Sequence, residues 1–166
     1  NEIFKILESK VMNLKFLIGI GRQYEKIHSL HKSFSEANES IRLMQKFDDR
    51  GGVSHFEDHS VYHFLDSNIK DMELEDFFMK RLGKVYEHDL LHGTSYITTL
   101  ENYFLNNLNI SETSKAMFIH RNTLIYRIEK IKEILNSDLK NSEELLQIQI
   151  ALKIFRLLNK ELRMDS

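Results

Sequence analysis

The feature that most constrains the fold is the apolar repeat within residues 121–135, RNTLIYRIEKIKEIL. Its apolar side chains recur at spacings of three and four residues, which is the period of an α-helix that buries one face. The members of this stripe are Leu124, Ile128, Ile131 and Leu135. The sequence therefore predicts an amphipathic helix that packs against other elements through this stripe.

The remaining surface of the predicted helix is polar and basic from its first turn. On a helical wheel, the residues opposite the stripe are Asn122, Tyr126 and Glu129. Those along its two edges are Arg121 and Ile125 on one side, and Thr123, Arg127 and Lys130 on the other. The hydrogen-bonding side chains thus share one exposed face, with basic side chains beside them.

A short helical segment, residues 111–118, precedes this helix across a tight connection, in the order of a helix-turn-helix motif. In that motif the second helix enters the DNA major groove with its N-terminus first. Asparagine and threonine can hydrogen-bond base edges, whereas lysine and arginine neutralise phosphates. We expect Asn122, Thr123 and Tyr126 to face bases, and Lys115, Arg121, Arg127 and Lys130 to hold phosphates. Ile119, in the turn, is expected to be buried.

Two other interpretations fit the same pattern. An antiparallel helical hairpin in a bundle also needs two helices, a short turn and an apolar stripe, and Phe118 stands where helix-turn-helix turns often have glycine. In that case the helix would be a protein-interaction or dimerisation module, with Ile125 and Tyr126 as its anchors. An enzyme is the weakest alternative.

Charge is distributed unevenly along the chain, whose formal net charge is −2. Residues 48–92 hold eleven acidic and five basic residues, while residues 115–132 hold five basic residues and one acidic residue. This local basic patch favours an anion-docking site over a protein that coats nucleic acid. A chain without cysteine has no disulfide, thiol nucleophile or Cys-based zinc site, and it suits a reducing compartment.

The chain shows neither a membrane-spanning apolar run nor a signal peptide, so we expect a cytoplasmic protein. It starts without methionine, in a segment that already has a folded pattern, and we expect it to be a fragment of a longer protein.

The first third of the chain predicts an αβαβ block. The expected elements are a helix at 2–12, a strand at 14–22, a helix at 26–47 and a strand at 53–58. The 26–47 helix is expected to bury a stripe of Ile27, Leu30, Phe34, Ala37, Ile41 and Met44. So few strands leave a sheet incomplete, and a partner strand is expected from upstream or from another chain.

The rest of the chain is predicted to be helical. Short and long helices are expected at 61–68 and 71–91, and Thr94 or Ser95 is expected to cap a helix that extends to Asn107. Asn109 or Ser111 is expected to cap the 111–118 helix, and Asn141 with Glu144 forms a possible capping box for a final helix.

Histidines and carboxylates offer rival sites. The pairs His55/His59, His59/His63 and His88/His92 are spaced four residues apart, as metal ligands on one helix face are. They lack an evident third ligand, and we expect no metal or other cofactor. The acidic clusters at 57–58 and 71–76 are interpreted as solvated surface, because nothing apolar surrounds them to raise a pKa. We therefore expect no catalytic residues.

The stretches NISETSKAMFIHRNTLIYRIEKIKEIL and DLKNSEELLQIQIALKIFRLL resemble the C-terminal helix-turn-helix domain of the PucR/CdaR family of bacterial regulators. Upstream, GIGRQYEKIHSLHKSFSEANESIRL and VSHFED are similar to the last part of the preceding domain in CdaR-type members, a degenerate relative of the GGDEF nucleotide-cyclase fold. Two positions depart from the family pattern: Ile125 stands where a basic residue is frequent, and Ser114 replaces a small alanine. Gly51–Gly52 lacks the acidic pair that a cyclase signature needs.

The resemblance implies a mostly helical α+β protein, with a partial GGDEF-like α/β module at 1–66 and a helical DNA-binding domain at 67–166 whose helix-turn-helix spans 111–135. It implies a non-enzymatic, sequence-specific transcriptional regulator that binds double-stranded DNA and senses its effector through an N-terminal region absent from this chain. Motifs of this kind act as dimers on half-sites about 34 Å apart, so we expect a homodimer, formed through the sheet edge or the last helix.

Overall fold

The computed structural model describes residues 16–47 and 52–162, with side chains as far as residue 158. The helix expected at residues 2–12 lies outside these ranges. The chain divides into two compact units, one of residues 71–155 and one of the residues before Asp71 together with those after Phe155. The prediction of a mostly helical α+β protein is confirmed, because nine helical segments accompany one two-stranded sheet in the described ranges.

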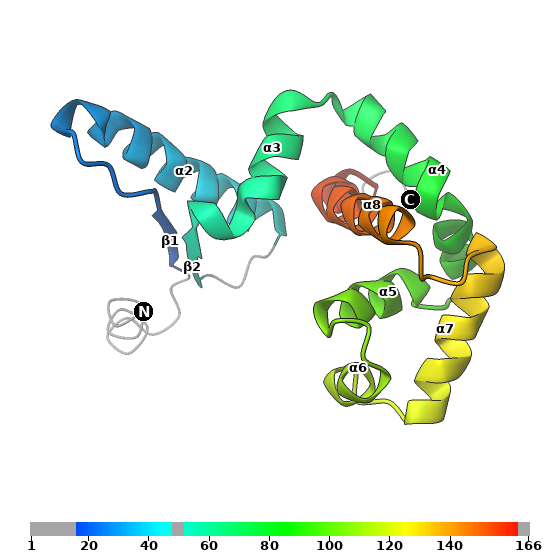
Figure 1. Ribbon diagram of the computed structural model, residues 1–166. Coiled ribbons are helices and arrows are strands. Elements are labelled where there is room, and N and C mark those ends of the chain that lie inside the picture. Colours follow the sequence, from blue (N-terminus) through cyan, green and yellow to red (C-terminus); the bar gives the residue numbers. More distant parts are fainter. Residues whose placement is uncertain (1–15, 48–51, 163–166) are drawn as a thin grey trace. The chain divides into compact units, whose positions relative to one another are not determined.

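The first unit is built on a pair of parallel strands. Its elements are β1 (Leu17–Ile20), η1 (Ile27–Ser29), α2 (Leu30–Phe47), β2 (Gly52–His55), η2 (Phe56–His59) and α3 (Ser60–Asn68). Leu17 lies opposite Gly52, and Ile20 lies opposite His55. Parallel neighbours cannot be joined by a tight turn, and α2 supplies the crossover between them (Figure 1).

Two glycines of the β1 segment let α2 lie against it at backbone distance. A Cβ atom added to Gly19 would stand 1.9 Å from the Ala37 carbonyl oxygen, and one added to Gly21 would stand 2.0 Å from the Ser33 carbonyl oxygen. No side chain fits such a gap. The glycines therefore fix which face of α2 meets the sheet.

Because α2 lies so close to β1, half of the apolar stripe predicted for the 26–47 helix is not buried. Ile27, Leu30 and Phe34 are exposed, at 90%, 69% and 72% of their surface, although they were expected to be buried. Small side chains face β1 at this end of the helix, because only they fit beside glycine backbone. Farther along, Ile41 lies within 3 Å of the Gly19 Cβ position and Leu43 is fully buried, so the apolar face forms in the second half only.

Several predicted element bounds also change. The strand expected at 53–58 ends at His55, and a 3-10 helix follows it. The strand expected at 14–22 is described as Leu17–Ile20 only, with residues 14 and 15 outside the described ranges. The helix expected to reach Asn107 ends at Leu105, because Asn107 and Leu108 adopt positive φ angles of 52° and 59°.

A carboxylate joins α2 to the segment that follows β1. Glu36 accepts hydrogen bonds from the Arg22 backbone N–H at 2.9 Å, the Arg22 guanidinium at 2.6 Å and the Tyr24 hydroxyl at 2.5 Å. Burial alone would raise the pKa of the Glu36 carboxyl, but these hydrogen bonds outweigh it and lower the pKa to about 2. The charged form of Glu36 is therefore the one that the fold needs.

This pKa predicts acid sensitivity in the first unit. Because the Glu36 pKa lies near 2 in the folded chain and 4.5 is its ordinary value, its stabilisation is complete above pH 4.5 and is lost as the pH falls toward 2. Urea unfolding followed by circular dichroism across this range should show a steeper decline for the parent than for Glu36→Gln, which cannot ionise. Parallel declines would contradict the assignment.

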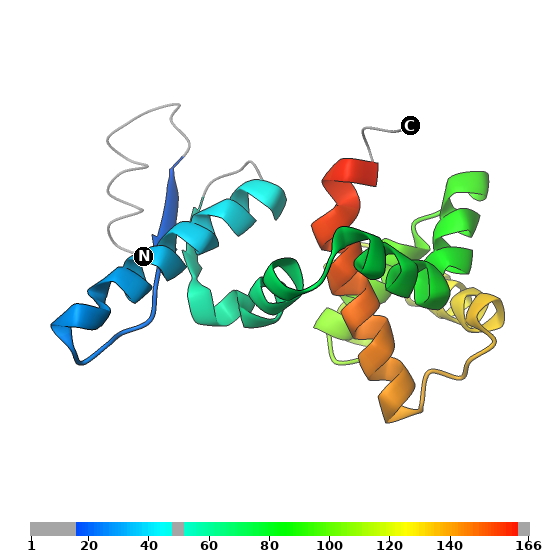
Figure 2. The same ribbon diagram turned by 90° about the horizontal axis from the view of Figure 1, so that it is seen from above.

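The second unit is a five-helix assembly. Its helices are α4 (Asp71–His92), α5 (Tyr96–Leu105), α6 (Ile110–Ala116), α7 (Arg121–Leu135) and the start of α8 (Ser142–Leu162). Its core contains Leu74, Phe78, Leu82, Val85, Ile97, Leu100, Leu124, Ile128, Ile131, Ile148 and Ile154. The α8 ring of Phe155 stacks on Phe78 of α4, with ring centroids 5.1 Å apart, which fixes α8 beside α4 (Figure 2).

The predicted cap of the last helix is confirmed in part. The Asn141 side-chain oxygen accepts a hydrogen bond from the Glu144 backbone N–H at 3.0 Å, which is one half of a capping box. None of the helices in the part of the chain that the structure describes combines the length and the apolar character needed to cross a membrane.

Candidate nucleic-acid interface

Helices α6 and α7 form a helix-turn-helix. Asn109 caps α6, because its side-chain oxygen accepts hydrogen bonds from the backbone N–H groups of Ser111 and Glu112 at 2.9 and 3.1 Å. Thr113 and Ser114 on α6 are buried. The hydroxyl of Ser114, where the family pattern has alanine, bonds the Ser111 carbonyl at 3.0 Å, so its burial leaves no unpaired donor.

The turn between the two helices is tight, and it is closed by two backbone bonds. The Phe118 N–H donates to the Lys115 carbonyl at 3.1 Å, and the Ile119 N–H donates to the Ser114 carbonyl at 3.0 Å. Phe118 has a φ of 55°, so α6 ends at Ala116 rather than at Phe118 as predicted. Position 118, where glycine is frequent in such turns, therefore has a left-handed backbone conformation, although its residue is phenylalanine. Ile119, expected to be buried, is only partly covered.

Helix α7 has the predicted bounds, Arg121–Leu135. Its first turn is capped by His120, whose Nδ1 accepts the Asn122 N–H at 3.2 Å, an arrangement that requires an unprotonated Nδ1. Leu124, Ile128 and Ile131 are at most 2% exposed, while Leu135 is partly exposed. The predicted stripe therefore faces the core over its first three positions.

The opposite face of α7 lies in solvent as predicted. Arg121, Asn122, Thr123, Tyr126 and Glu129 are exposed, and Ile125 is half-buried at the edge. Tyr126 is 60% exposed, and the Lys130 ammonium lies 6.0 Å from the centre of its ring. The buried stripe holds α7 against the core, and polar, aromatic and basic side chains extend into solvent from its other face.

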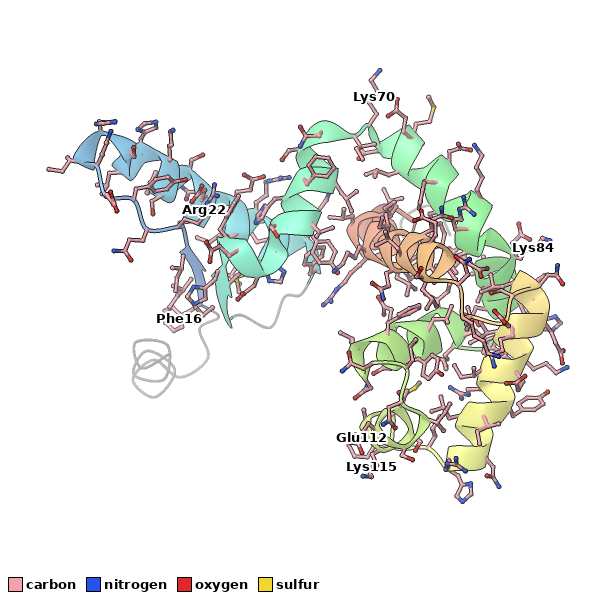
Figure 3. The ribbon with its side chains drawn as sticks, in the orientation of Figure 1. Phe16, Arg22, Lys70, Lys84, Glu112 and Lys115 are labelled. Carbon is pink, nitrogen blue, oxygen red and sulfur yellow. The ribbon has the colours of Figure 1, made fainter. Side chains whose placement is uncertain are left out.

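Most of the expected phosphate-binding residues have partners within the chain. Lys115 pairs with Glu112 at 3.1 Å on the outer side of α6, as Figure 3 shows. Lys130 pairs with Glu133 at 2.6 Å, and that hydrogen bond raises the pKa of Lys130 above its usual range. The guanidinium of Arg127 lies 3.4 Å from the Thr99 hydroxyl, toward α5. Of these four basic residues, Arg121 is the one without a salt bridge or a side-chain hydrogen bond to another described residue, so it is the most available of the four to an external anion.

Helix α5, on which α7 packs, is capped in an unexpected way. Thr94 or Ser95 was predicted to cap it, but neither does so through its side chain. Instead Asp89 reaches over from α4, and its carboxylate accepts the backbone N–H groups of Tyr96 at 2.8 Å and Ile97 at 2.9 Å. The Thr94 hydroxyl donates to the same carboxylate. The prediction failed because the cap comes from a neighbouring helix, to which local sequence patterns do not point.

The structure brings no metal-ligand set together among the residues that it describes. His63 is buried and stacks on Phe56 with ring centroids 4.1 Å apart. The rings of His88 and His92 do lie close, at 4.4 Å between centroids, but His88 also stacks on Tyr96 and bonds the Thr94 hydroxyl. These histidines are packing residues around the starts of α3 and α5.

Comparison with known proteins agrees with this geometry. Residues 96–154, from α5 into α8, match the model of the PucR C-terminal helix-turn-helix domain. The chain is 30% identical over 140 residues to the proline-responsive transcriptional activator PutR of Bacillus subtilis, which covers 84% of this chain and 34% of that protein. The chain belongs to the PucR/CdaR family. The resemblance of its helix-turn-helix stretches to that family, noted in the sequence, is thereby confirmed.

Two further relatives extend the comparison across the family. The purine catabolism regulatory protein of Bacillus subtilis is 30% identical over 85% of this chain and 26% of its own length. The carbohydrate diacid regulator of Escherichia coli is 28% identical over 85% of this chain and 36% of its own length. This PucR/CdaR chain thus spans about a third of the length of the curated relatives that it matches. No solved structure matches it significantly.

Proposed function

We propose that this PucR/CdaR chain is the DNA-binding part of a transcription regulator, in which α7 enters the major groove of double-stranded DNA. The observation that supports this most is the division of α7 into a buried stripe and an exposed polar face. Leu124, Ile128 and Ile131 hold the helix rigidly, so that Asn122 and Tyr126 extend into solvent together. A groove-reading helix requires this combination of fixed position and free hydrogen-bonding groups.

The roles within the groove follow from chemistry and exposure. Asn122 can pair bidentately with adenine, Thr123 can offer its hydroxyl to a base edge or its methyl to thymine, and Tyr126 extends the base-facing surface. Lys115, Arg121, Arg127 and Lys130 would hold phosphates. Of these, Arg121 can bind phosphate without breaking an existing salt bridge, whereas Lys115 and Lys130 must exchange a glutamate for the phosphate.

The remaining parts of the proposal concern the whole protein. The parallel strands and α2 would be the end of a degenerate GGDEF-like module within residues 1–66, and residues 67–166 the DNA-binding domain. The regulator would act without catalysis in the cytoplasm, as a homodimer that occupies two half-sites. Its effector would be sensed by a region that this chain does not contain.

Salt titration of duplex binding tests the DNA assignment. Phosphate contacts release counterions, so the affinity of the parent should fall steeply with salt. Arg121→Ala should weaken binding to all sequences and reduce the slope of log affinity against log salt by about 1, while Asn122→Ala should chiefly erode sequence preference, by about 1–3 kcal/mol at one base pair. Fluorescence anisotropy with duplexes selected from random sequences measures both effects.

A matched control comes from α4. Lys80 is exposed and pairs with Asp76 at 2.6 Å, outside the helix-turn-helix, so Lys80→Ala removes the same charge from a surface that should not touch DNA. Its salt slope should equal that of the parent. If the Arg121 and Asn122 variants both bind like the parent, α7 is not the DNA-reading helix, and a protein-docking role for Ile125 and Tyr126 replaces it.

A further inference from the structure

Phe118 breaks two rules of protein structure at once. Its φ of 55° is a left-handed conformation that bulky side chains rarely adopt. Its side chain is also 95% exposed, the highest value among the exposed large apolar residues of the described chain. Glycine would satisfy the same turn without backbone strain and without placing an aromatic ring in water.

Nothing within the described part of the chain benefits from this ring. A side chain exposed at 95% has almost no packing contacts, so it adds little to the stability of the turn. The two backbone bonds that close the turn come from the main chain, and any residue except proline could donate them. Strained residues of this kind are typical of binding sites, where the cost is offset by an external contact.

The surroundings of Phe118 point to the nature of that contact. Its N–H bonds the carbonyl of Lys115, and it precedes the cap residue His120 and the exposed Arg121 by two and three positions. It therefore lies between Lys115 and Arg121, two of the basic residues assigned to phosphates, at the end of α7 that enters the groove. Successive phosphates of a DNA strand are separated by deoxyribose, whose carbon face is apolar.

We propose that Phe118 packs its ring against a deoxyribose of the DNA strand whose phosphates Lys115 and Arg121 hold. This inference rests on the proposed function and adds a residue to it that basic and polar patterns do not identify. Because the ring is uncharged and sugars are alike at every position, the contact contributes affinity without sequence preference and without counterion release.

The experiment compares variants of the full chain on a duplex of mixed sequence. Phe118→Gly and Phe118→Asn both suit a left-handed turn and both remove the ring. We expect each to fold with a thermal midpoint no lower than that of the parent, and to bind about tenfold more weakly, as the loss of a partly buried aromatic contact implies. The salt slope should match that of the parent, in contrast to the flattened slope of Arg121→Ala.

Leu91→Ala provides the matched control, since Leu91 is 79% exposed on α4, outside the helix-turn-helix, and its loss should leave duplex affinity unchanged. If the Phe118 variants bind the mixed-sequence duplex as tightly as the parent while Arg121→Ala does not, the sugar contact is wrong and the ring docks on protein instead. A changed salt slope or a selective loss on particular sequences would also overturn it. If the parent shows no salt-dependent duplex binding, the proposed function fails and this inference fails with it.

Discussion

Asp89→Ala is expected to lower the free energy of unfolding of the helical unit by roughly 2–3 kcal/mol, more than any surface substitution in α4. The reason is that one carboxylate accepts the N–H groups of Tyr96 and Ile97 and the hydroxyl of Thr94. Its loss leaves the start of α5 without a cap and separates α5 from α4. Since α7 packs on α5, duplex binding should weaken in parallel. Urea unfolding followed by circular dichroism measures the first effect.

Asp76→Ala is the control on the same helix. Asp76 forms an exposed pair with Lys80, in which both side chains are more than 60% accessible, and such pairs contribute between about 0 and 1 kcal/mol. This variant should unfold within about 0.5 kcal/mol of the parent. An equally small loss of unfolding free energy for Asp89→Ala would show that water can replace the carboxylate as the hydrogen-bond acceptor for the backbone N–H groups at the start of α5. Asp89→Asn keeps an acceptor oxygen without the charge, so its loss of unfolding free energy should lie between those of Asp76→Ala and Asp89→Ala.

Gly19→Ala is expected to have the largest effect in the first unit. The added methyl would stand 1.9 Å from the Ala37 carbonyl oxygen and 2.8 Å from its carbonyl carbon, so α2 must move away from β1. Backbone displaced by an added methyl costs about 1–3 kcal/mol or more. Loss of that contact should appear as faster amide hydrogen exchange in α2 and β1, with exchange in α7 unchanged.

The glycine of α4 provides the contrast. At Gly83, a Cβ atom would lie 3.2 Å from the Met79 methyl group, the far end of a flexible side chain. Gly83→Ala should therefore be neutral or stabilising, by up to about 1 kcal/mol, because alanine favours a helix interior. Equal destabilisation by both substitutions would show that steric contact with α2 is not what requires glycine at position 19.

The sequence predicted the second unit better than the first for a physical reason. The period of Leu124, Ile128 and Ile131 faces a core made of other helices, so apolar residues there are buried as the pattern indicates. Along the first half of α2 the neighbour is the backbone at Gly19 and Gly21, and so close an approach admits only small side chains. Ile27 and Phe34 follow the helical period equally well, yet they lie in solvent. Periodicity identifies a helix, but the shape of the partner decides which face is covered.

The candidate site shows the same division. The exposed face of α7 and the Asn109 cap follow from local pattern, and the structure contains both. A tight connection was also expected, but its left-handed residue, Phe118, was assigned to the preceding helix. The Asp89 cap does not, since its carboxylate acts seven and eight residues away across a loop. Phe118 was visible as an unusual turn residue, but its near-complete exposure became evident only with the fold. The DNA roles of individual side chains stay predictions.

The ion pairs beside the helix-turn-helix have a consequence for how the surface meets a nucleic acid. Lys115, Lys130 and Lys132 each have a glutamate three residues away along the same helix. These carboxylates belong to the same helix as the lysines. Unlike mobile anions of the solvent, they would stay nearby after a lysine turns toward a phosphate, and they would repel that phosphate. Random contacts with DNA would thereby be less attractive than the number of basic residues indicates. A larger share of the binding free energy would then be left to the uncharged side chains of α7, which can respond to the base sequence.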